Sequence, residues 1–144
     1  MLNKKELLIL SKLRADSRKS LAKISQETKI PVSTIFDKVN KLKKVIKKHT
    51  CILDFSKIGY SARVNLALKT SKDKRDALKQ FLLKNKNVNS LYRTHEKYDF
   101  IAECLFKDLK EFYDFLEQLD KFELESKEEF HIVEEIKSED FLNS

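Results

Sequence analysis

Residues 20–42, SLAKISQETKIPVSTIFDKVNKL, carry the pattern that decides the fold of this chain. The second half of the stretch, residues 32–42, places Ile35, Val39 and Leu42 at positions i, i+4 and i+7, which form one stripe of a 3.6-residue period. The first half carries a shorter apolar face, and a tight turn separates the two. Two short amphipathic helices joined in this way predict a helix-turn-helix, in which residues 32–42 would enter the major groove of DNA.

Flanking signals predict three helices within residues 1–45. The first is expected over residues 2–13, with a buried face formed by Leu2, Ile9, Leu10 and Leu13. Ser20 would cap the second helix, because its hydroxyl can accept a hydrogen bond from a free N–H in the first turn. The buried face of that helix would hold Leu21, Ala22 and Ile24. Pro31 suits the first turn of the third helix, where a missing N–H costs nothing. The sequence thus predicts a trihelical, winged helix-turn-helix domain over residues 1–45.

The charge of the chain is divided unevenly. Its 144 residues are 41% hydrophobic and 37% charged, which is too charged for an average soluble protein and too apolar for disorder. Residues 1–50 hold 14 Lys and Arg against 4 Asp and Glu, a net charge of +10, whereas the remainder carries −3. A basic block joined to a mildly acidic remainder predicts a nucleic-acid-binding module attached to a second domain. The alternative is a solvated, lysine-rich surface.

The polar side of residues 32–42 supplies candidate contacts to double-stranded DNA. Base edges would be reached from the start of the helix by Ser33, Thr34, Asp37 and Lys38. Phosphate would be bound without sequence preference by Lys19, Lys29, Lys41, Lys43 and Lys44, and Ser20 is included with the DNA-binding residues. Asp37 could accept a hydrogen bond from a cytosine amino group or only orient Lys41. Phe36 lies at the edge of the apolar stripe, so core packing is favoured over a thymine-methyl contact.

Beyond the helices, residues 46–60 are expected to form a β connector. Residues 46–54 are β-like and contain no Pro or Gly, and Gly59-Tyr60 marks a turn. Residues 61–144 then read as a ferredoxin-like βαββαβ domain, which makes the whole chain α+β.

The βαββαβ prediction rests on alternating and helical apolar patterns. A half-buried strand is indicated by Ala62, Val64, Leu66 and Leu68, which alternate with polar residues. The later elements are a helix over 73–84 burying Ala77, Leu78, Phe81 and Leu82; strands over 88–95 and 98–106; a helical stripe of Leu109, Phe112, Tyr113, Leu116 and Leu119; and a last strand with Phe130, Ile132 and Ile136. One sheet face would carry Leu91, Ile101, Leu105 and Val133, the other Tyr92, Phe100, Phe106 and Ile132. Apolar residues on both faces predict association through the sheet.

The remaining chemistry-bearing residues show no catalytic or metal-binding spacing. Cys51 and Cys104 lie outside any CxxC pattern, and the three histidines are scattered, so we expect no metal, no cofactor and no enzyme activity. No apolar run is long enough for a signal peptide or a membrane span, which favours a cytoplasmic protein without a membrane partner.

The combination of these motifs resembles the Lrp/AsnC (leucine-responsive/asparagine, feast/famine) family of transcriptional regulators. The likeness is carried by the following groups of residues: Leu2-Asn3, Glu6, Ile9-Leu10, Leu13, Asp16-Ser17-Arg18, Ser20 and Ile24; Ile30, Ser33-Thr34-Ile35, Lys38-Val39 and Leu42; and Ile58-Gly59-Tyr60, Val88 and Tyr98-Asp99-Phe100. It implies a sequence-specific DNA-binding protein that docks as a homodimer, or as a tetramer or octamer, on pseudo-palindromic sites.

The resemblance also implies an effector loop between the second and third strands. An amino acid or related small molecule would bind there through Thr94, His95, Glu96, Tyr98 and Asp99. The family usually has Gly two residues before the Tyr-Asp pair, where this chain has Glu96, and Gly is the residue that adopts positive φ most readily. The Asp99 carboxylate could pair with an effector amino group or bond to the turn backbone.

Two other functions remain open at this stage. A nonspecific, chromatin-like DNA organiser would need only lysine contacts and higher assembly. A tetrapyrrole decarboxylase-like enzyme of similar fold would need suitable His and Arg residues around a large pocket, and only three His are present.

Overall fold

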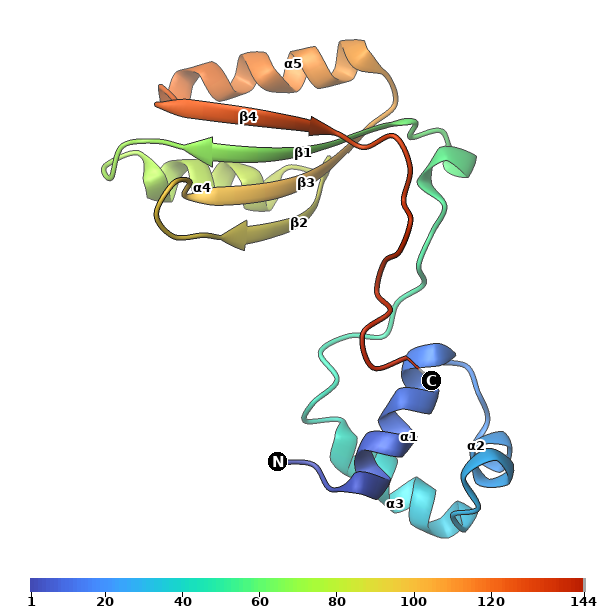
Figure 1. Ribbon diagram of the computed structural model, residues 1–144. Helices are drawn as coiled ribbons and strands as arrows, with labels where there is room; N and C mark the ends of the chain where they lie inside the picture. The colour runs from blue at the N-terminus through green and yellow to red at the C-terminus, as the bar shows by residue number, and fades with distance from the viewer. Residues whose placement is uncertain (144) are drawn as a thin grey trace. The chain divides into compact units, whose positions relative to one another are not determined.

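The computed structural model describes residues 1–143, which form two compact units. The N-terminal unit comprises Met1–Ile52 together with the segment from Ile136 onward, and the sheet unit comprises Leu53–Glu135. Three helices make up the first: α1 (Lys4–Ala15), α2 (Leu21–Thr28) and α3 (Val32–Leu42). The sheet unit holds four strands and two helices, and Figure 1 shows each unit with its elements labelled.

The three helices enclose a small apolar core. Its buried members are Ile9, Ile24, Ile30, Ile35 and Leu42. The stripe predicted for α3 is confirmed, since Val39 packs against this core as well. Leu2, which precedes α1, and Leu10 and Leu13 of α1 are only half-buried. On α2 the prediction for Ala22 is wrong because its side chain is exposed. A short helix such as α2 has room for one narrow apolar stripe, which Leu21 and Ile24 fill.

Local hydrogen bonds define the start of α2 and the turn between α2 and α3. The Ser20 hydroxyl accepts a hydrogen bond from the Lys23 N–H at 3.1 Å, which confirms the predicted cap. Lys29 ends α2 in the left-handed conformation at φ 62°, and Pro31 occupies the N-cap position of α3, one residue before the expected first turn. The Ser25 hydroxyl donates to the Ile30 carbonyl at 2.6 Å. The backbone of the turn is therefore fixed on both sides.

A C-terminal segment completes the N-terminal unit. The Arg14 guanidinium pairs with the Glu139 carboxylate at 3.1 Å and donates from Nε to the Phe141 carbonyl at 2.9 Å. These contacts attach the segment from Ile136 onward to α1. Ile136 is therefore not part of the last strand, contrary to the sequence prediction.

The connector differs from its prediction. Residues 46–54 form no strand, and none of the described residues of the N-terminal unit forms the expected wing. A strand needs a neighbour for its backbone N–H and C=O groups, and none of the described strands pairs with this segment to supply one. The segment leads instead into a 3₁₀ turn, η1 (Phe55–Ile58), which ends at Gly59 with φ 92°, as the predicted turn requires.

The sheet unit has the strand order of a ferredoxin-like fold. Its strands are β1 (Ala62–Lys69), β2 (Val88–Arg93), β3 (Phe100–Phe106) and β4 (Ser126–His131), all antiparallel in the order β2-β3-β1-β4. The helices are α4 (Arg75–Lys84) and α5 (Leu109–Leu119), followed by the short turn η2 (Asp120–Phe122). The α+β, βαββαβ prediction is confirmed.

Both helices cover the same face of the sheet. Val64, Leu66 and Leu68 of β1 face Cys104, Ala102 and Phe100 of β3 in register. This layer joins Leu78 and Leu82 of α4 and Phe112, Phe115 and Leu119 of α5 in one buried cluster. Ala77, Leu109 and Tyr113, which were expected to be buried, are exposed, because the packed side of each helix is narrower than the apolar pattern suggested.

The other face of the sheet is open and partly apolar. It carries Ile101, Leu105, Tyr92, Phe130, Ala67 and Asn65, as the strand register places them. Leu91 points to the helix side and Tyr92 to the open side, which reverses the prediction for β2. A register shift between Val88 and Ser90 sets this phase, and alternation within one strand cannot reveal it. Apolar residues on both faces are nevertheless present, as predicted.

Candidate nucleic-acid interface

The exposed side of α3 is mainly polar and is bounded by lysines. Ile35 and Leu42 are buried, so the opposite side of the helix presents Ser33, Asp37 and Lys41, all exposed. Asn40, which the sequence argument overlooked, is exposed on this same side. A helical wheel of residues 32–42 would have identified it, since 40 lies between 36 and 33 in projection. Short polar side chains on a helix of this size can meet base edges in a major groove.

Two residues predicted to contact DNA, Thr34 and Lys38, lie on the flank of α3 and are only partly accessible. The Lys38 ammonium pairs with the Glu6 carboxylate of α1 at 3.2 Å, and both side chains are mostly buried. The hydrogen bond from Lys38 holds the pKa of Glu6 below its ordinary value, against a smaller opposing effect of desolvation. Thr34 is half-buried beside it. In this chain Lys38 fixes α3 against α1.

Among the other predicted DNA-binding residues, some are held by intramolecular bonds and others are exposed. Lys19 pairs with Glu27 at 2.9 Å, and this hydrogen bond lowers the pKa of the Glu27 carboxyl group. Ser20 is engaged as the cap of α2. Lys29, at the turn before α3, and Lys41, Lys43 and Lys44, at the end of α3, are exposed. The four exposed ammonium groups thus lie at the two ends of the helix.

Phe36 lies outside the core. Its side chain is 56% exposed, so the prediction of core packing is wrong. Ile9, Ile24 and Ile30 from the neighbouring segments already close the core around Ile35. A residue at the edge of an apolar stripe is buried only when a neighbouring element covers it, and Phe36 is not among the residues that pack against this core.

The loop between β2 and β3 is tightly bonded. The Thr94 N–H donates to the Asp99 carbonyl, and the Thr94 hydroxyl donates to the Tyr98 carbonyl, both at 2.8 Å. The Tyr98 hydroxyl donates to the Glu128 carboxylate of β4 at 2.8 Å, an interaction that raises the pKa of Tyr98. His95 and Glu96 are exposed at the tip of the loop.

Asp99 is buried among three basic side chains. It is 2% exposed, and its carboxylate lies 3.1 Å from Arg75 Nε and 3.5 Å from both Lys69 Nζ and Arg93 Nη1. The Thr70 N–H donates to it at 2.9 Å. Burial raises the carboxyl pKa, but the Thr70 hydrogen bond and the positive charges of Arg75 and Lys69 outweigh it, so the net pKa is lowered. The carboxylate thus bonds to the backbone N–H of Thr70, which follows β1, rather than to the backbone of its own turn between β2 and β3, which was one of the alternatives stated from the sequence.

Glu96 adopts the backbone conformation that its position requires. Its φ is 71°, in the left-handed region that favours glycine. The loop therefore keeps a positive-φ residue two positions before Tyr98-Asp99, although the side chain there is Glu.

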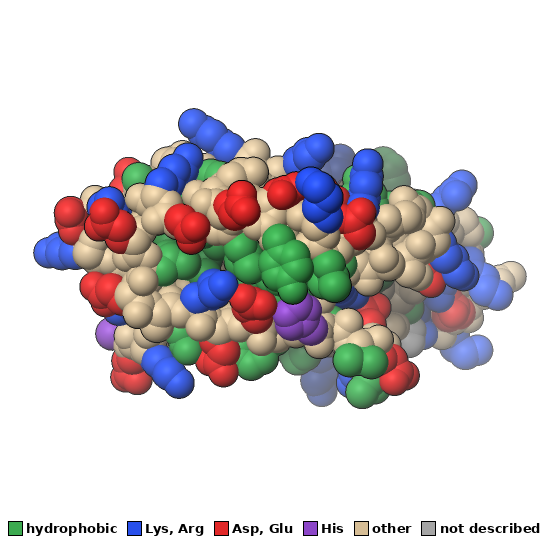
Figure 2. Space-filling view, turned by 90° about the horizontal axis from the view of Figure 1, so that it is seen from above, with side chains coloured by type: hydrophobic (Ala, Val, Ile, Leu, Met, Phe, Trp, Pro, Cys, Tyr) green, Lys and Arg blue, Asp and Glu red, His purple; other side chains and the backbone are tan. Residues whose placement is uncertain are grey.

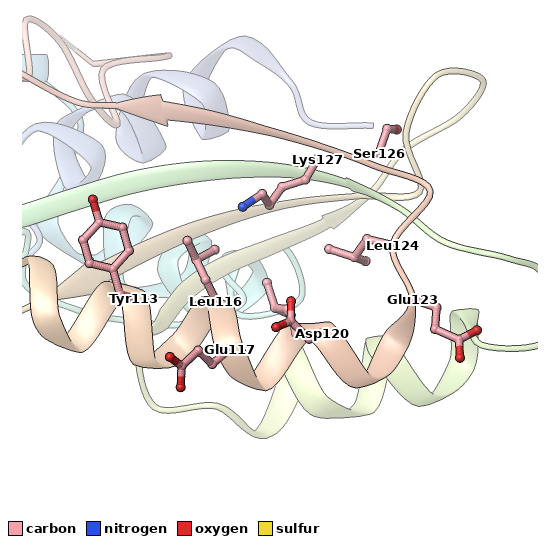
Figure 3. Close-up of a pocket in the computed structure, with 9 residues that line it drawn as sticks. Tyr113, Leu116, Glu117, Asp120, Glu123, Leu124, Ser126 and Lys127 are labelled. Atoms are coloured by element: carbon pink, nitrogen blue, oxygen red, sulfur yellow. The ribbon is translucent and has the colours of Figure 1, made fainter.

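A separate groove lies between α5 and β4. It encloses about 760 Å³, and Figure 3 shows Leu116 and Leu124 within it, with Glu117, Asp120 and Glu123 from α5 and the turn that follows. Figure 2 looks onto the side that carries α5 and shows hydrophobic side chains gathered between charged ones. The groove contains no histidine or cysteine, and none of the residues that the structure describes forms a group of three or more metal-binding side chains.

Burial raises the pKa of the Cys104 thiol to about 12, which leaves it protonated.

Comparison with known proteins identifies the class. Residues 61–140 match the family model of the Lrp/AsnC ligand-binding domain. The chain is 30% identical over 135 residues to an uncharacterised helix-turn-helix-type transcriptional regulator of Pyrococcus horikoshii, and the match covers 92% of this chain and 91% of that protein. This chain therefore belongs to the Lrp/AsnC family of transcriptional regulators, as the resemblance predicted.

Individual relatives agree with this assignment. An uncharacterised helix-turn-helix-type regulator of Pyrococcus abyssi is 29% identical over 143 residues, covering 98% of this chain and 97% of that protein. The helix-turn-helix-type transcriptional regulator FL11 of Pyrococcus horikoshii is 31% identical over 111 residues, covering 76% of this chain and 74% of FL11.

Solved structures share the fold. A Neisseria meningitidis transcriptional regulator in complex with L-methionine superposes with a TM-score of 0.87 at 17% identity, covering 96% of this chain and 94% of that one. LrpC of Bacillus subtilis gives 0.86 at 19% identity, covering 96% and 99%. Among the described residues, the helices are too short or too polar to cross a bilayer.

Proposed function

We propose that this regulator binds specific sequences of double-stranded DNA with α3 in the major groove. The observation that carries the proposal is the side of α3 opposite Ile35 and Leu42, where Ser33, Asp37 and Asn40 are exposed between lysines at both ends of the helix. Base edges are read by short polar side chains, and phosphates on either side of the groove are bound by basic ones.

The candidate residues would have different roles in DNA binding, according to their exposure and their ion pairs. Lys29, Lys41, Lys43 and Lys44 would bind phosphate, since their ammonium groups are exposed at the ends of α3. Ser33 and Asp37 would reach base edges, with Thr34 at their margin. Lys38 and Lys19 would act chiefly through their ion pairs, which orient α3 and α2. Ser20 would cap the start of α2 and present its backbone to a phosphate.

The proposed division of the chain follows from these roles. Residues 1–45 would bind DNA, residues 46–60 would connect, and residues 61–144 would carry assembly and effector binding. Among the described residues no strand pairs with the connector segment, so in an assembly its backbone could pair with the same segment of a second copy.

Assembly would use the open face of the sheet. Ile101, Tyr92 and Phe130 are exposed there and form an apolar surface that a second copy could cover. A dimer formed in this way would present two α3 helices to a pseudo-palindromic site with half-sites about one or more helical turns apart.

A small-molecule effector is a further part of the proposal. The solved relative from Neisseria meningitidis holds L-methionine, and Glu96 preserves the positive φ expected of an effector loop. In this chain an amino acid or related molecule would meet Thr94, His95, Glu96 and Tyr98, whereas the Asp99 carboxylate is already bonded to Thr70 and paired with three cations.

Selection of bound duplexes from a random pool, followed by footprinting, tests the DNA proposal. Discrete protected half-sites with a shared sequence are expected. Continuous coverage without a selected sequence would favour the nonspecific DNA organiser, for which lysine contacts alone suffice. Equal binding of all duplexes at moderate salt would refute sequence-specific binding.

A further inference from the structure

Two large apolar side chains are exposed on α3. Val32 is 45% exposed and Phe36 is 56% exposed. They are four residues apart, so they lie next to each other on the surface of α3, and we refer to them as the Val32–Phe36 pair. Asn40 continues the same row one turn further on.

The pair is not needed by the core of its own unit. Ile35 and Leu42 fill the buried side of α3, and Ile9, Ile24 and Ile30 close the core around them. Phe36 makes no aromatic contact with another described ring, whereas Phe81, Phe106 and Phe112 of the sheet unit all stack with neighbours. The Val32–Phe36 pair therefore presents an apolar surface outward from α3, the helix that we propose binds DNA.

The charge around the pair indicates what covers it. Lys29 lies before α3, and Lys41, Lys43 and Lys44 lie at its end, within a block of net charge +10. A surface of this sign attracts a polyanion. Among the base edges of a major groove, the one apolar group is the C5-methyl of thymine, and aromatic and aliphatic side chains pack against it.

We infer that the Val32–Phe36 pair packs against thymine methyl groups and selects A·T base pairs at the positions it covers. The inference rests on the proposed binding of DNA through α3 and names what part of that helix reads. Asn40, in the same row, has the amide that can bond in two places to adenine N6 and N7. The row thus matches the two partners of A·T pairs, with apolar groups for thymine and an amide for adenine.

Replacing thymine by deoxyuridine isolates the methyl group. The experiment uses the full chain and the operator obtained by selection, with each thymine replaced in turn. Burial of one methyl-sized group corresponds to about a fourfold change in affinity. We expect wild-type binding to fall about fourfold at one or two thymines of a half-site, and about fifteenfold when the equivalent thymines of both half-sites are replaced.

Variants connect the effect to the pair. At the thymine that Phe36 covers, Phe36→Ala should bind the thymine and deoxyuridine operators equally, and its thermal unfolding should match wild type because the side chain is exposed. Tyr113→Ala is the matched control: Tyr113 is 57% exposed on α5, and its loss should leave the discrimination intact.

The outcomes separate this inference from the proposal beneath it. If a specific operator is selected but no thymine of it responds to deoxyuridine, the inference is wrong and sequence-specific binding stands. If Phe36→Ala instead alters the mass of the assembly in solution and leaves the discrimination unchanged, the pair is a protein contact and the inference is again wrong. If no operator can be selected at all, the proposed function itself fails.

Discussion

Glu96 shows how a single residue can keep a loop shape at the expense of stability. Its φ of 71° costs a side-chain-bearing residue about 1 kcal/mol relative to the right-handed region. The surrounding hydrogen bonds of Thr94 to Tyr98 and Asp99 hold the loop in place regardless. Strain retained in this way is common at ligand-binding loops.

Replacing Glu96 by Gly should stabilise the protein. Relief of the left-handed strain exceeds the entropy that Gly adds to the unfolded chain, so we expect a gain of about 0.5 kcal/mol in the free energy of unfolding. Thermal unfolding would detect it as a rise of about 2 °C. Glu96→Ala keeps a Cβ atom at the strained position and should show no gain; equal stabilisation by Ala would point to the charge instead.

Asp99 makes the opposite kind of contribution. Asp99→Asn should destabilise the sheet unit by about 3 kcal/mol, because three cations and the Thr70 N–H lose a buried anion. Asp114→Asn removes an exposed pair with Lys110 at 3.0 Å and should cost less than about 0.5 kcal/mol. Denaturant unfolding of both variants measures the difference.

The same carboxylate predicts a pH dependence. Its pKa in the folded state lies below the unfolded value of about 3.9. The stabilisation is therefore fully present above that unfolded value and is lost as the pH falls through the folded pKa. The stability difference between wild type and Asp99→Asn should stay constant at neutral pH and shrink only below about pH 4. A difference that shrinks between pH 7 and 5 would contradict this account.

At the scale of elements, α3 combines two independent surfaces. Its buried stripe of Ile35 and Leu42 joins the core, while its outer side and its lysine-rich end remain free. Lys38 connects the two through Glu6 of α1, so the angle of α3 is fixed by an ion pair as well as by packing.

Lys41 tests the phosphate contacts of this helix. Lys41→Ala should weaken binding to all DNA sequences alike and reduce the slope of log affinity against log salt by about 1 per protomer. Lys79→Ala removes an exposed lysine of α4 and should change neither quantity. Titration of duplexes across salt concentrations measures both. A change confined to one sequence would assign Lys41 to base reading.

Local patterns of the sequence predicted most of these elements. The Ser20 cap, the α3 stripe and the Gly59 turn each depend on interactions within a few residues, and all three are present. Phe36 was misplaced because its burial depends on how far α1 and α2 reach. The connector forms no strand because pairing requires a neighbouring strand, and none of the described strands pairs with it.

The same contrast between local and long-range interactions holds for the sheet and for the loop between β2 and β3. Alternation within β2 was visible, but its phase relative to β3 depends on the irregularity between Val88 and Ser90. The ions around Asp99 come from β1, α4 and β2, and only the folded topology brings Lys69, Arg75 and Arg93 together. Long-range placement of this kind leaves no mark in a local pattern.

At the scale of the molecule, the open sheet face is expected to couple assembly to DNA affinity. Phe130→Asp would place a third carboxylate near Glu128 and Glu103, so it should convert the assembly to monomers. Binding through two linked half-sites is about 100-fold or more tighter than binding through one. The apparent affinity of the monomeric variant for a full operator should therefore fall by a similar factor. Sedimentation and DNA titration measure the two effects.

Tyr113→Asp provides the control for that prediction. Tyr113 is exposed on α5, on the helix-covered side of the unit, so its replacement should leave the mass and the affinity unchanged. If Phe130→Asp remains fully assembled, another surface holds the copies together.

The ion pair between Arg14 and Glu139 has a practical consequence for how this protein is made and cut. The N-terminal unit is discontinuous: its helices are synthesised before the sheet unit, and the segment that bonds to α1 is synthesised after it. A fragment ending in the connector would therefore lack part of the surface of the N-terminal unit.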